Sequence, residues 1–355
     1  MEIMIGNRYV GDGHPCFITY EAGPTHDGLQ TAKELVRHAA EAGADAVKFQ
    51  ILNTEKLVKD KSLSFSYEIL VDRDTGETRK VSEPLYQILK RRELSRNEWL
   101  ELKQFCDQLG LAFFATVDDE ENIALLEEMG CQSIKIASAD VNHFPLLRQA
   151  ARTGMCVQLD TGNSTLGEIE RAVDVIRAEG NENIIIHNCP SGYPARVDSI
   201  NLNILKTLKS MFGLPVAYSD HTPGAEMDIA AVAIGANLIE KTITLDRMTP
   251  GVEHIMSLEP KEMKGFIQTI RDIERAMGSG RRILTKDELE KCKAIRRSVV
   301  LNAPVEAGTS LAEAGVYFSR PGYGLSPDLY EQMLSCKFIS GFEAGEVVYP
   351  HMLRK

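Results

Sequence analysis

The sequence predicts an α/β fold, a TIM (β/α)8 barrel followed by a small C-terminal domain. Between residues 16 and 282, short apolar runs alternate with longer segments of helical period, which is typical of repeated βα units. Eight such runs occur, and eight is the number that closes a barrel. The chain of 355 residues also exceeds the roughly 250 residues of a barrel, so it leaves room for a second, smaller domain.

The expected strands are apolar along most of their length, as in parallel strands that are covered on both faces. A doubly wound sheet would contain similar strands, and the count of eight favours the barrel. Several helical segments between the strands end at a glycine, the residue expected just past a helix C-terminus. The strands are predicted at residues 17–21, 46–50, 112–116, 133–138, 157–161, 184–187, 216–220 and 238–242.

The connection after the second strand, residues 52–111, is much longer than most βα connections. Its stretch SFSYEILVDRDTGETRKVSEP has strand-like flanks on both sides of an Asp-Thr-Gly turn. This pattern predicts a β-hairpin that acts as a lid over the mouth of the barrel.

The character of the chain changes after the eighth repeat. We expect a barrel domain at residues 1–280, a charged linker at 281–295 and a second domain at 296–355. The pieces SVVLNAPVEAGTSL, VYFSRPGYGLSP and GEVVYP predict short strands in this second domain. A unit of about 60 residues is marginally stable on its own, so we expect it to dock on another surface.

Composition and charge narrow the class of protein. The net charge of −11 provides no general attraction to nucleic acid or to anionic membranes, so an anionic ligand must be held by local cations. No window approaches the roughly 18 apolar residues of a membrane span, and the start of the chain lacks the pattern of an export signal. Seven cysteines without a CxxC pair predict reduced thiols. We therefore expect a cytoplasmic protein.

Polar residues stand at or near the C-terminal ends of the predicted strands, where barrel enzymes place their active sites. A single polar residue at a strand end is commonly satisfied by backbone or water, but such residues at all eight strands together favour a functional site. They are Glu21, Lys48, Gln50, Thr116, Lys135, Ser138, Asp160, Thr161, His187, Asp220, His221, Glu240 and Lys241.

Two histidines end neighbouring strands. His187 follows the sixth strand and His221 the seventh, so both imidazoles could reach one divalent cation. Two protein ligands leave open positions, which suits a metal that polarises a substrate carbonyl. The alternative is a pair of hydrogen-bonded histidines without a metal.

Lys48 and Lys135 lie within apolar strands, where an ammonium group is costly without an anion beside it. An anionic ligand would supply one. Thr116, Ser138 and Ser191 could complete a phosphate or carboxylate cradle, although hydroxyls often bond the backbone instead. We interpret Cys189, which follows His187, as an inert thiol because no partner base is visible.

A series of motifs carries a family resemblance. EAGPTHDG, ADAVKFQ, IKIASAD, HNCPSGYPA, YSDHTPG, IEKTITLDR and PGVEHIMSLEP occur in this order. Each is weak alone, but as a series they resemble the sialic acid synthases, which include N-acetylneuraminate, legionaminate and pseudaminate synthases and spore-coat polysaccharide relatives. The C-terminal RRSVV and SRPGYGLSP resemble the antifreeze-like (SAF) domain attached to those barrels.

The resemblance implies a condensation of phosphoenolpyruvate with an N-acyl hexosamine, such as N-acetylmannosamine or a 2,4-diacetamido-trideoxyhexose. The product would be a nine-carbon 2-keto acid, with release of phosphate. It also implies Mn²⁺ or Mg²⁺ on His187 and His221, catalytic roles for Glu21 and Asp246, and a domain-swapped homodimer in which Arg320 reaches the partner's site. The implied substrate-binding residues are Lys48, Gln50, Thr116, Lys135, Ser138, Asn163, Ser191, Tyr193 and Arg320.

Departures from the family pattern bear on the choice of sugar. Thr25, Asp160, Asn163, Thr242 and Glu253 stand where the family usually has other residues, and some of these positions line the sugar end. The sequence therefore leaves the acceptor sugar open.

Two alternatives remain. A phosphoenolpyruvate aldol synthase acting on a phosphorylated aldose would need a second basic cluster at the barrel mouth, and no such cluster is clearly placed there. A catalytically silent sugar-binding relative is the other, since a fold alone does not prove activity.

Overall fold

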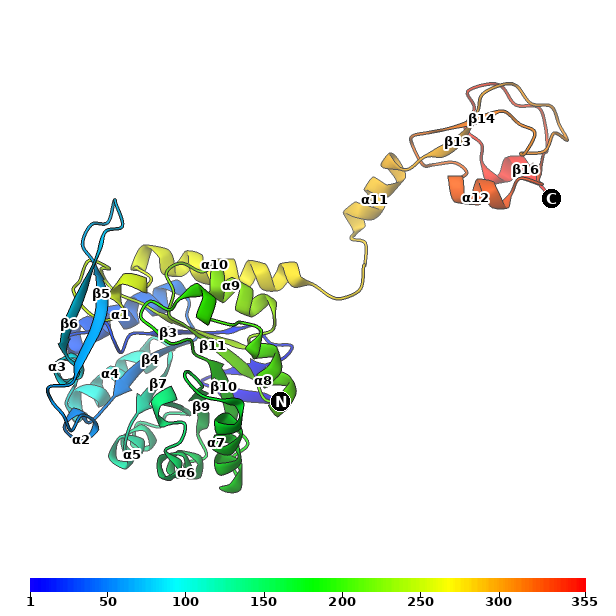
Figure 1. Ribbon diagram of the computed structural model, residues 1–355. Helices are drawn as coiled ribbons and strands as arrows, with labels where there is room; N and C mark the ends of the chain where they lie inside the picture. The colour runs from blue at the N-terminus through cyan, green and yellow to red at the C-terminus, as the bar shows by residue number, and fades with distance from the viewer. The chain divides into compact units, whose positions relative to one another are not determined.

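The computed structural model describes residues 1–355 and divides into two compact units, Met1–Gly278 and Ser279–Lys355 (Figure 1). The first unit contains the barrel, and the second contains one helix of the 281–295 segment together with the short C-terminal strands. Each unit has a hydrophobic core of its own.

Eight parallel strands close into a barrel in the order β3-β4-β7-β8-β9-β10-β11-β12, so the predicted fold is confirmed. Thr242 at the end of β12 pairs with Glu21 at the end of β3, which closes the ring. The largest departure from the predicted strands is at β8, which ends at Ile136. The barrel strands are β3 Phe17–Glu21, β4 Ala46–Ile51, β7 Ala112–Val117, β8 Ser133–Ile136, β9 Cys156–Asp160, β10 Ile184–Asn188, β11 Val216–Asp220 and β12 Leu238–Thr242.

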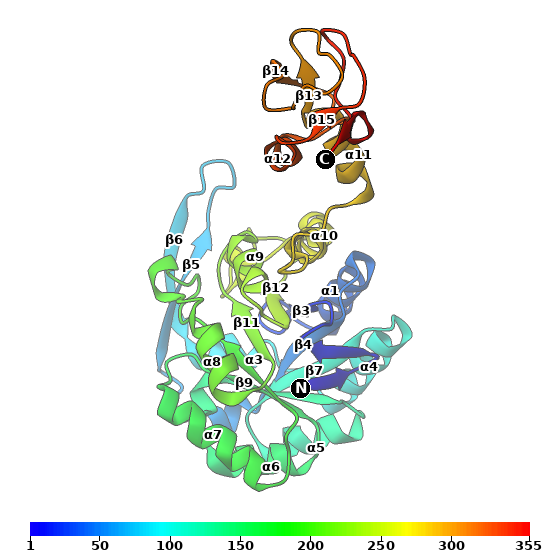
Figure 2. The ribbon, with the colours of Figure 1, turned by 90° about the vertical axis from the view of Figure 1, so that its right-hand side faces the viewer.

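Helices surround the barrel and bury their apolar faces against its strands (Figure 2). Local chemistry sets their ends. The hydroxyl of Ser95 accepts from the N–H of Glu98 while the Glu98 carboxylate accepts from the N–H of Ser95, and Gly43 ends the first helix at a φ of 88°. The outer helices are α1 Leu29–Ala42, α4 Arg96–Gln108, α5 Glu120–Glu128, α6 Phe144–Arg152, α7 Leu166–Ala178, α8 Ile204–Phe212, α9 Glu226–Ala233 and α10 Pro260–Met277.

An N-terminal hairpin covers the N-terminal end of the barrel. Its strands, β1 Glu2–Ile5 and β2 Arg8–Gly11, pair antiparallel. Ile3, Ile5 and Val10 are buried against residues that begin barrel strands, such as Phe17 and Leu238. The sequence analysis did not identify this hairpin, which seals the barrel opposite the expected site.

The long second connection forms the predicted hairpin, β5 Ser64–Leu70 and β6 Thr78–Pro84, flanked by the short helices α2 Thr54–Leu57 and α3 Leu85–Lys90. Tyr67 and Ile69 pack with Ile88 and with Val252, which lies in the loop after β12. Near the tip, the Arg73 guanidinium donates to the carboxylates of Asp246 at 2.6 Å and Glu259 at 2.7 Å. The hairpin is therefore attached to the loops at the C-terminal end of the barrel.

The second unit is small and irregular. Its core gathers Val299, Leu301, Leu311, Phe338 and Val348. Helix α11, Lys286–Ile295, occupies most of the stretch expected to be a linker, and none of its residues is buried. The remaining elements are β13 Ser298–Leu301, β14 Val316–Ser319, α12 Pro327–Gln332, β15 Lys337–Phe338 and β16 Leu353–Arg354.

All seven cysteines are free, and five of them are buried, as expected of reduced core thiols. None of the helices combines the length and the apolar character that crossing a membrane requires.

Candidate active site

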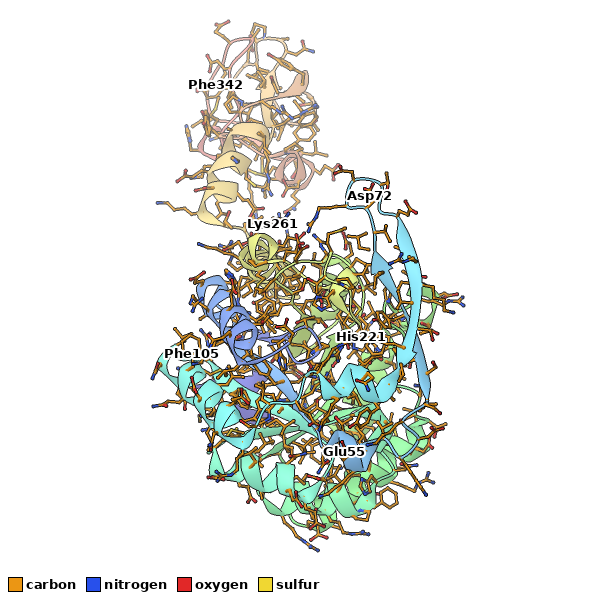
Figure 3. The ribbon with its side chains drawn as sticks, turned by 90° about the vertical axis from the view of Figure 1, so that its left-hand side faces the viewer. Glu55, Asp72, Phe105, His221, Lys261 and Phe342 are labelled. Atoms are coloured by element: carbon orange, nitrogen blue, oxygen red, sulfur yellow. The ribbon has the colours of Figure 1, made fainter.

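A cavity of about 290 Å³ lies at the C-terminal end of the barrel strands. Strand ends and strand-following loops form much of its wall, and the second connection contributes Leu57, Phe65 and Leu85. In Figure 3, Asp72 marks the tip of the hairpin and His221 lies within the barrel unit. The predicted site residues that line the cavity are Glu21, Lys48, Gln50, Thr116, Ser138, Tyr193 and His221.

A buried ionic network joins the two lysines of the site. Lys48 Nζ lies 2.5 Å from a Glu21 oxygen and 2.6 Å from Glu240, and Lys135 Nζ lies 2.7 Å from Glu240 and 3.0 Å from Asp160. The protein's own carboxylates thus supply the counter-charges that we expected from an anionic ligand. Lys48 still lines the cavity, whereas Lys135 is 0% exposed and lies beneath it.

The network sets the protonation of its members. Burial disfavours the ammonium form of Lys48, but the adjacent Glu21 and Glu240 carboxylates raise its pKa well above the ordinary value. For Glu240, burial opposes ionisation, and the two lysines nevertheless lower its pKa well below the usual range. For Glu21, burial dominates and raises the pKa. Glu21 therefore accepts a proton more readily than Glu240.

His187 does not face the cavity. Its ring is fully buried, and Nε2 lies 2.9 Å from the Gln158 side-chain oxygen. Nδ1 lies 2.9 Å from the Ser219 hydroxyl and 3.2 Å from Lys135 Nζ. Burial, reinforced by the Lys135 charge, lowers its pKa well below the ordinary value, so the ring is neutral. With both ring nitrogens engaged, the two-histidine metal site predicted from the sequence is not formed in the structure.

His221 does face the cavity. Its Nδ1–H donates to the Pro190 carbonyl at 2.9 Å, and its ring lies near the Tyr193 ring at a centroid distance of 4.6 Å. Such an Nδ1–H bond fixes the tautomer in which Nε2 is the acceptor, as in many metal-binding histidines. Burial lowers the pKa of His221, which favours the neutral form that binds metals.

The donor set around His221 is sparse for a metal. No group of three or more His, Cys, Asp or Glu side chains is arranged to hold a cation. Carboxylates of Glu21, Asp160, Glu240 and Glu253 line the same cavity. These residues fit a divalent cation that takes one nitrogen from His221 and most of its remaining ligands from oxygen atoms of water and substrate.

Glu253 is a site residue that the sequence analysis noted only as a departure from the family pattern. Its carboxyl lines the cavity and accepts from the Thr242 hydroxyl at 3.3 Å. Burial raises its pKa to about 7, and the nearby Glu21 carboxylate adds to the effect. A carboxyl that titrates near neutral pH in a cavity is a candidate for proton transfer.

Arg92 is the second residue that the sequence analysis missed. It lies between α3 and α4, in the long second connection, and it lines the cavity while being only 8% exposed. Its position in the sequence, next to another arginine in the polar stretch LKRREL, gave no signal of burial.

Several predicted residues lie outside the cavity lining. Ser191 donates to the Asn163 side-chain oxygen at 2.8 Å in exposed loops after β10 and β9. Asp246 is exposed and pairs with Arg73, so the structure does not place it as a catalytic group in the cavity. Arg320 is exposed in the C-terminal unit. Their assigned roles stay predictions.

Comparison with known proteins identifies the family. The family model described as NeuB family matches residues 35–282. The chain belongs to the NeuB family. It is 35% identical over 340 residues to the N,N'-diacetyllegionaminic acid synthase of Legionella pneumophila, with 94% of each protein covered. The N-acetylneuraminic acid synthetase structure from Leptospira borgpetersenii matches with a TM-score of 0.71 at 34% identity, covering 82% of this chain and 95% of that one.

Membership in the NeuB family confirms the resemblance that the motif series indicated. A truncated 3-deoxy-D-arabino-heptulosonate 7-phosphate synthase from Thermotoga maritima has a TM-score of 0.61 at 16% identity, covering 78% of this chain and 93% of that one. This likeness shows a shared barrel fold alone. The motifs that resemble the family, by contrast, supply Glu21, Lys48, Tyr193 and His221 to the cavity described above.

Proposed function

We propose that this chain condenses phosphoenolpyruvate with an N-acyl hexosamine to give a nine-carbon 2-keto acid and phosphate. The observation that carries the proposal is the cavity at the C-terminal end of the barrel, in which Lys48, Glu21, Glu253 and His221 meet. The Legionella relative is named for synthesis of such an acid, N,N'-diacetyllegionaminic acid.

The reaction forms one carbon–carbon bond and breaks one carbon–oxygen bond. The double-bond electrons of phosphoenolpyruvate join C3 to the aldehyde carbon of the sugar, whose oxygen takes up a proton. Water then adds at C2 and loses a proton, and C–O cleavage releases phosphate and leaves the 2-keto group. Glu21 and Glu253, whose carboxyl pKa values are both raised, are placed to carry these protons.

The cations and hydroxyls of the cavity bind phosphoenolpyruvate in this proposal. Lys48 faces the cavity beside Thr116 and Ser138, and Lys135 fixes Glu240 from below. Gln50 and Tyr193 bind at the sugar end. Roles for Asn163 and Ser191 require the loops after β9 and β10 to fold over the bound substrate.

A divalent cation, Mn²⁺ or Mg²⁺, would be held by His221 together with cavity oxygen atoms. When bound, it would polarise the aldehyde carbonyl as a Lewis acid. The proposal assigns His187 a supporting role, in which it orients Lys135 and Ser219.

We further propose cytoplasmic residence and a homodimer in which the C-terminal unit acts as an antifreeze-like (SAF) domain. In this assembly Arg320 of the partner subunit contributes to sugar binding. The exposure of Arg320 on the C-terminal unit supports the proposal, because the side chain is free to contact another surface.

Phosphate release tests the proposed reaction. Metal-stripped protein would be supplied with phosphoenolpyruvate, Mn²⁺ and one acceptor at a time from N-acetylmannosamine, 2,4-diacetamido-2,4,6-trideoxyhexoses and arabinose 5-phosphate. We expect metal-dependent release with an N-acyl hexosamine. His221→Ala should abolish release, whereas His143→Ala, at an exposed position, should not. Release with arabinose 5-phosphate alone would reject the proposal in favour of the phosphorylated-aldose synthase.

A further inference from the structure

Arg92 is a buried cation without a bonded partner. The residue is 8% exposed and lines the cavity, yet its guanidinium makes no side-chain hydrogen bond or ion pair within the chain. Such burial is costly for a guanidinium, and here it is severe enough to lower the pKa of Arg92. A residue of this kind marks the place of a missing anion.

The other cations of the site are already neutralised. Lys48 and Lys135 each contact two carboxylates at 3.0 Å or less. Arg91, the neighbour of Arg92, pairs outward with Glu83 on β6 at 2.7 Å. Arg92 is therefore the cation of the cavity that still has its hydrogen-bonding groups available for a ligand.

The ionisable groups that act most strongly on Arg92 are Glu253, Arg91, Glu21 and Tyr193. Glu253 and Glu21 are the carboxylates whose charges act on it, although neither bonds to it. Apolar side chains of Leu89 and Val252 line the same cavity and keep the local dielectric low. Tyr193, which the proposed reaction assigns to the sugar end, is among the groups that act on Arg92, so we assign Arg92 to the acceptor end.

We propose that Arg92 binds an anionic substituent of the acceptor, so that the preferred substrate is an acidic N-acyl hexosamine. A guanidinium offers a planar pair of donors that fits either a carboxylate or a phosphate. The two sources are a uronic acid carboxylate at C6 and a 6-phosphate. This inference rests on the proposed condensation, but its test does not require turnover.

Binding measurements separate the possibilities. Calorimetric titration of metal-stripped full-length protein would use N-acetylmannosamine, N-acetylmannosaminuronic acid, N-acetylmannosamine 6-phosphate and phosphoenolpyruvate as probes. We expect one acidic sugar to bind about tenfold more tightly than the neutral sugar. Arg92→Gln should weaken the binding of that acidic sugar about 30-fold. The acidic sugar that responds identifies the carboxylate or the phosphate.

Matched variants distinguish a specific contact from a loss of structure. Arg91→Gln removes the adjacent arginine without touching the cavity and should leave all affinities within about twofold. Arg92→Lys keeps the charge and should retain part of the preference. Thermal unfolding of Arg92→Gln, compared with the native chain, shows whether the fold is retained.

Three results would overturn the assignment of Arg92. In the first, neither acidic sugar binds more tightly than the neutral one. In the second, Arg92→Gln leaves the affinity for the acidic sugar unchanged. In the third, Arg92→Gln weakens the binding of phosphoenolpyruvate instead of the binding of the sugar. Failure of the proposed reaction is recognised separately, because it is seen as an absence of phosphate release with every acceptor while the binding preference persists.

Discussion

His187 and His221 differ in what surrounds their ring nitrogens. We expect His187→Ala to destabilise the barrel by roughly 3 kcal/mol, because it leaves Gln158 and Ser219 without partners and opens a cavity. His221→Ala should cost little stability but weaken Mn²⁺ binding at least tenfold. Urea unfolding and calorimetric titration with Mn²⁺ check the two effects.

Both measurements, of stability and of Mn²⁺ binding, need a matched control variant at an exposed histidine. His143→Ala removes an exposed imidazole and should change neither quantity. A His187→Ala protein of native stability that has lost Mn²⁺ affinity would contradict the assignment and restore the two-histidine metal site.

Glu253 should make stability depend on pH. Its pKa is about 7 in the folded protein, against an ordinary value of 4.5, so the folded state binds more protons between these values. Its contribution is therefore present in full below pH 4.5 and is lost as the pH rises through 7, by roughly 3 kcal/mol. The free energy of unfolding of Glu253→Gln, relative to that of the native chain, should therefore be higher at pH 8 than at pH 5.

Unfolding midpoints at both pH values measure this effect. Glu274→Gln, which changes a partly exposed carboxyl at the opposite end of the barrel, is the matched control variant. An equal pH response of Glu253→Gln and the native chain would show that Glu253 does not titrate in this range.

Polar residues at the C-terminal ends of the strands predicted much of the site, because parallel strands place their last residues at one end of the barrel. This pattern predicted Glu21, Lys48, Thr116 and His221 at the cavity. It did not distinguish His187, one strand away, because whether a strand residue points to solvent or to its neighbours depends on packing. Loop residues such as Arg92 carry no periodic signal, so their burial is visible only in the folded chain.

The β5–β6 hairpin is held by an arginine at its tip. Arg73 is 42% exposed, but its partner Glu259 is nearly buried, so we expect this attachment to be stronger than a typical surface pair. Arg73→Ala should speed amide hydrogen exchange across residues 64–84 roughly fivefold. Hydrogen–deuterium exchange with mass spectrometry measures this directly.

The control for the hairpin is Lys80→Ala, which removes an exposed charge from β6. Exchange in this variant should match the native chain. Because ion pairs are screened, about 1 M salt should also narrow the difference between Arg73→Ala and the native chain. Unchanged exchange in Arg73→Ala would mean that the apolar contacts of Tyr67 and Ile69 alone attach the hairpin.

Whole elements were predictable to different degrees. The barrel strands are apolar runs of regular spacing, and the β5–β6 hairpin has strand-like flanks around a turn. The β1–β2 hairpin has only four residues in each strand, and its covering role arises from contacts with Phe17 and Leu238 that are distant in sequence. Helix α11 has few apolar residues and buries none of them, so its apolar pattern is weak, although Thr285 and Glu288 form a capping box.

At the scale of the whole molecule, the proposed exchange of Arg320 between protomers can be tested by complementation. Arg320→Ala and His221→Ala should each be inactive alone. In a dimer formed from one of each, Arg320 of the second chain would complete the intact barrel of the first. Co-expression should then restore up to about a quarter of native activity, because half of random dimers are mixed and each has one working site.

Phosphate release from the co-expressed pair measures this recovery. Co-expression of His221→Ala with Glu21→Ala is the matched control, since both changes lie in the barrel and leave the C-terminal units intact. An inactive Arg320→Ala and His221→Ala pair that forms mixed dimers would place Arg320 in its own chain's site.

The apolar face of the β1–β2 hairpin closes the N-terminal end of the barrel. Ile3, Ile5 and Val10 are buried at that end, so in the proposed reaction we expect substrates and products to exchange at the C-terminal end, where the cavity lies. Both substrates would then enter, and both products would leave, at the same end of the barrel.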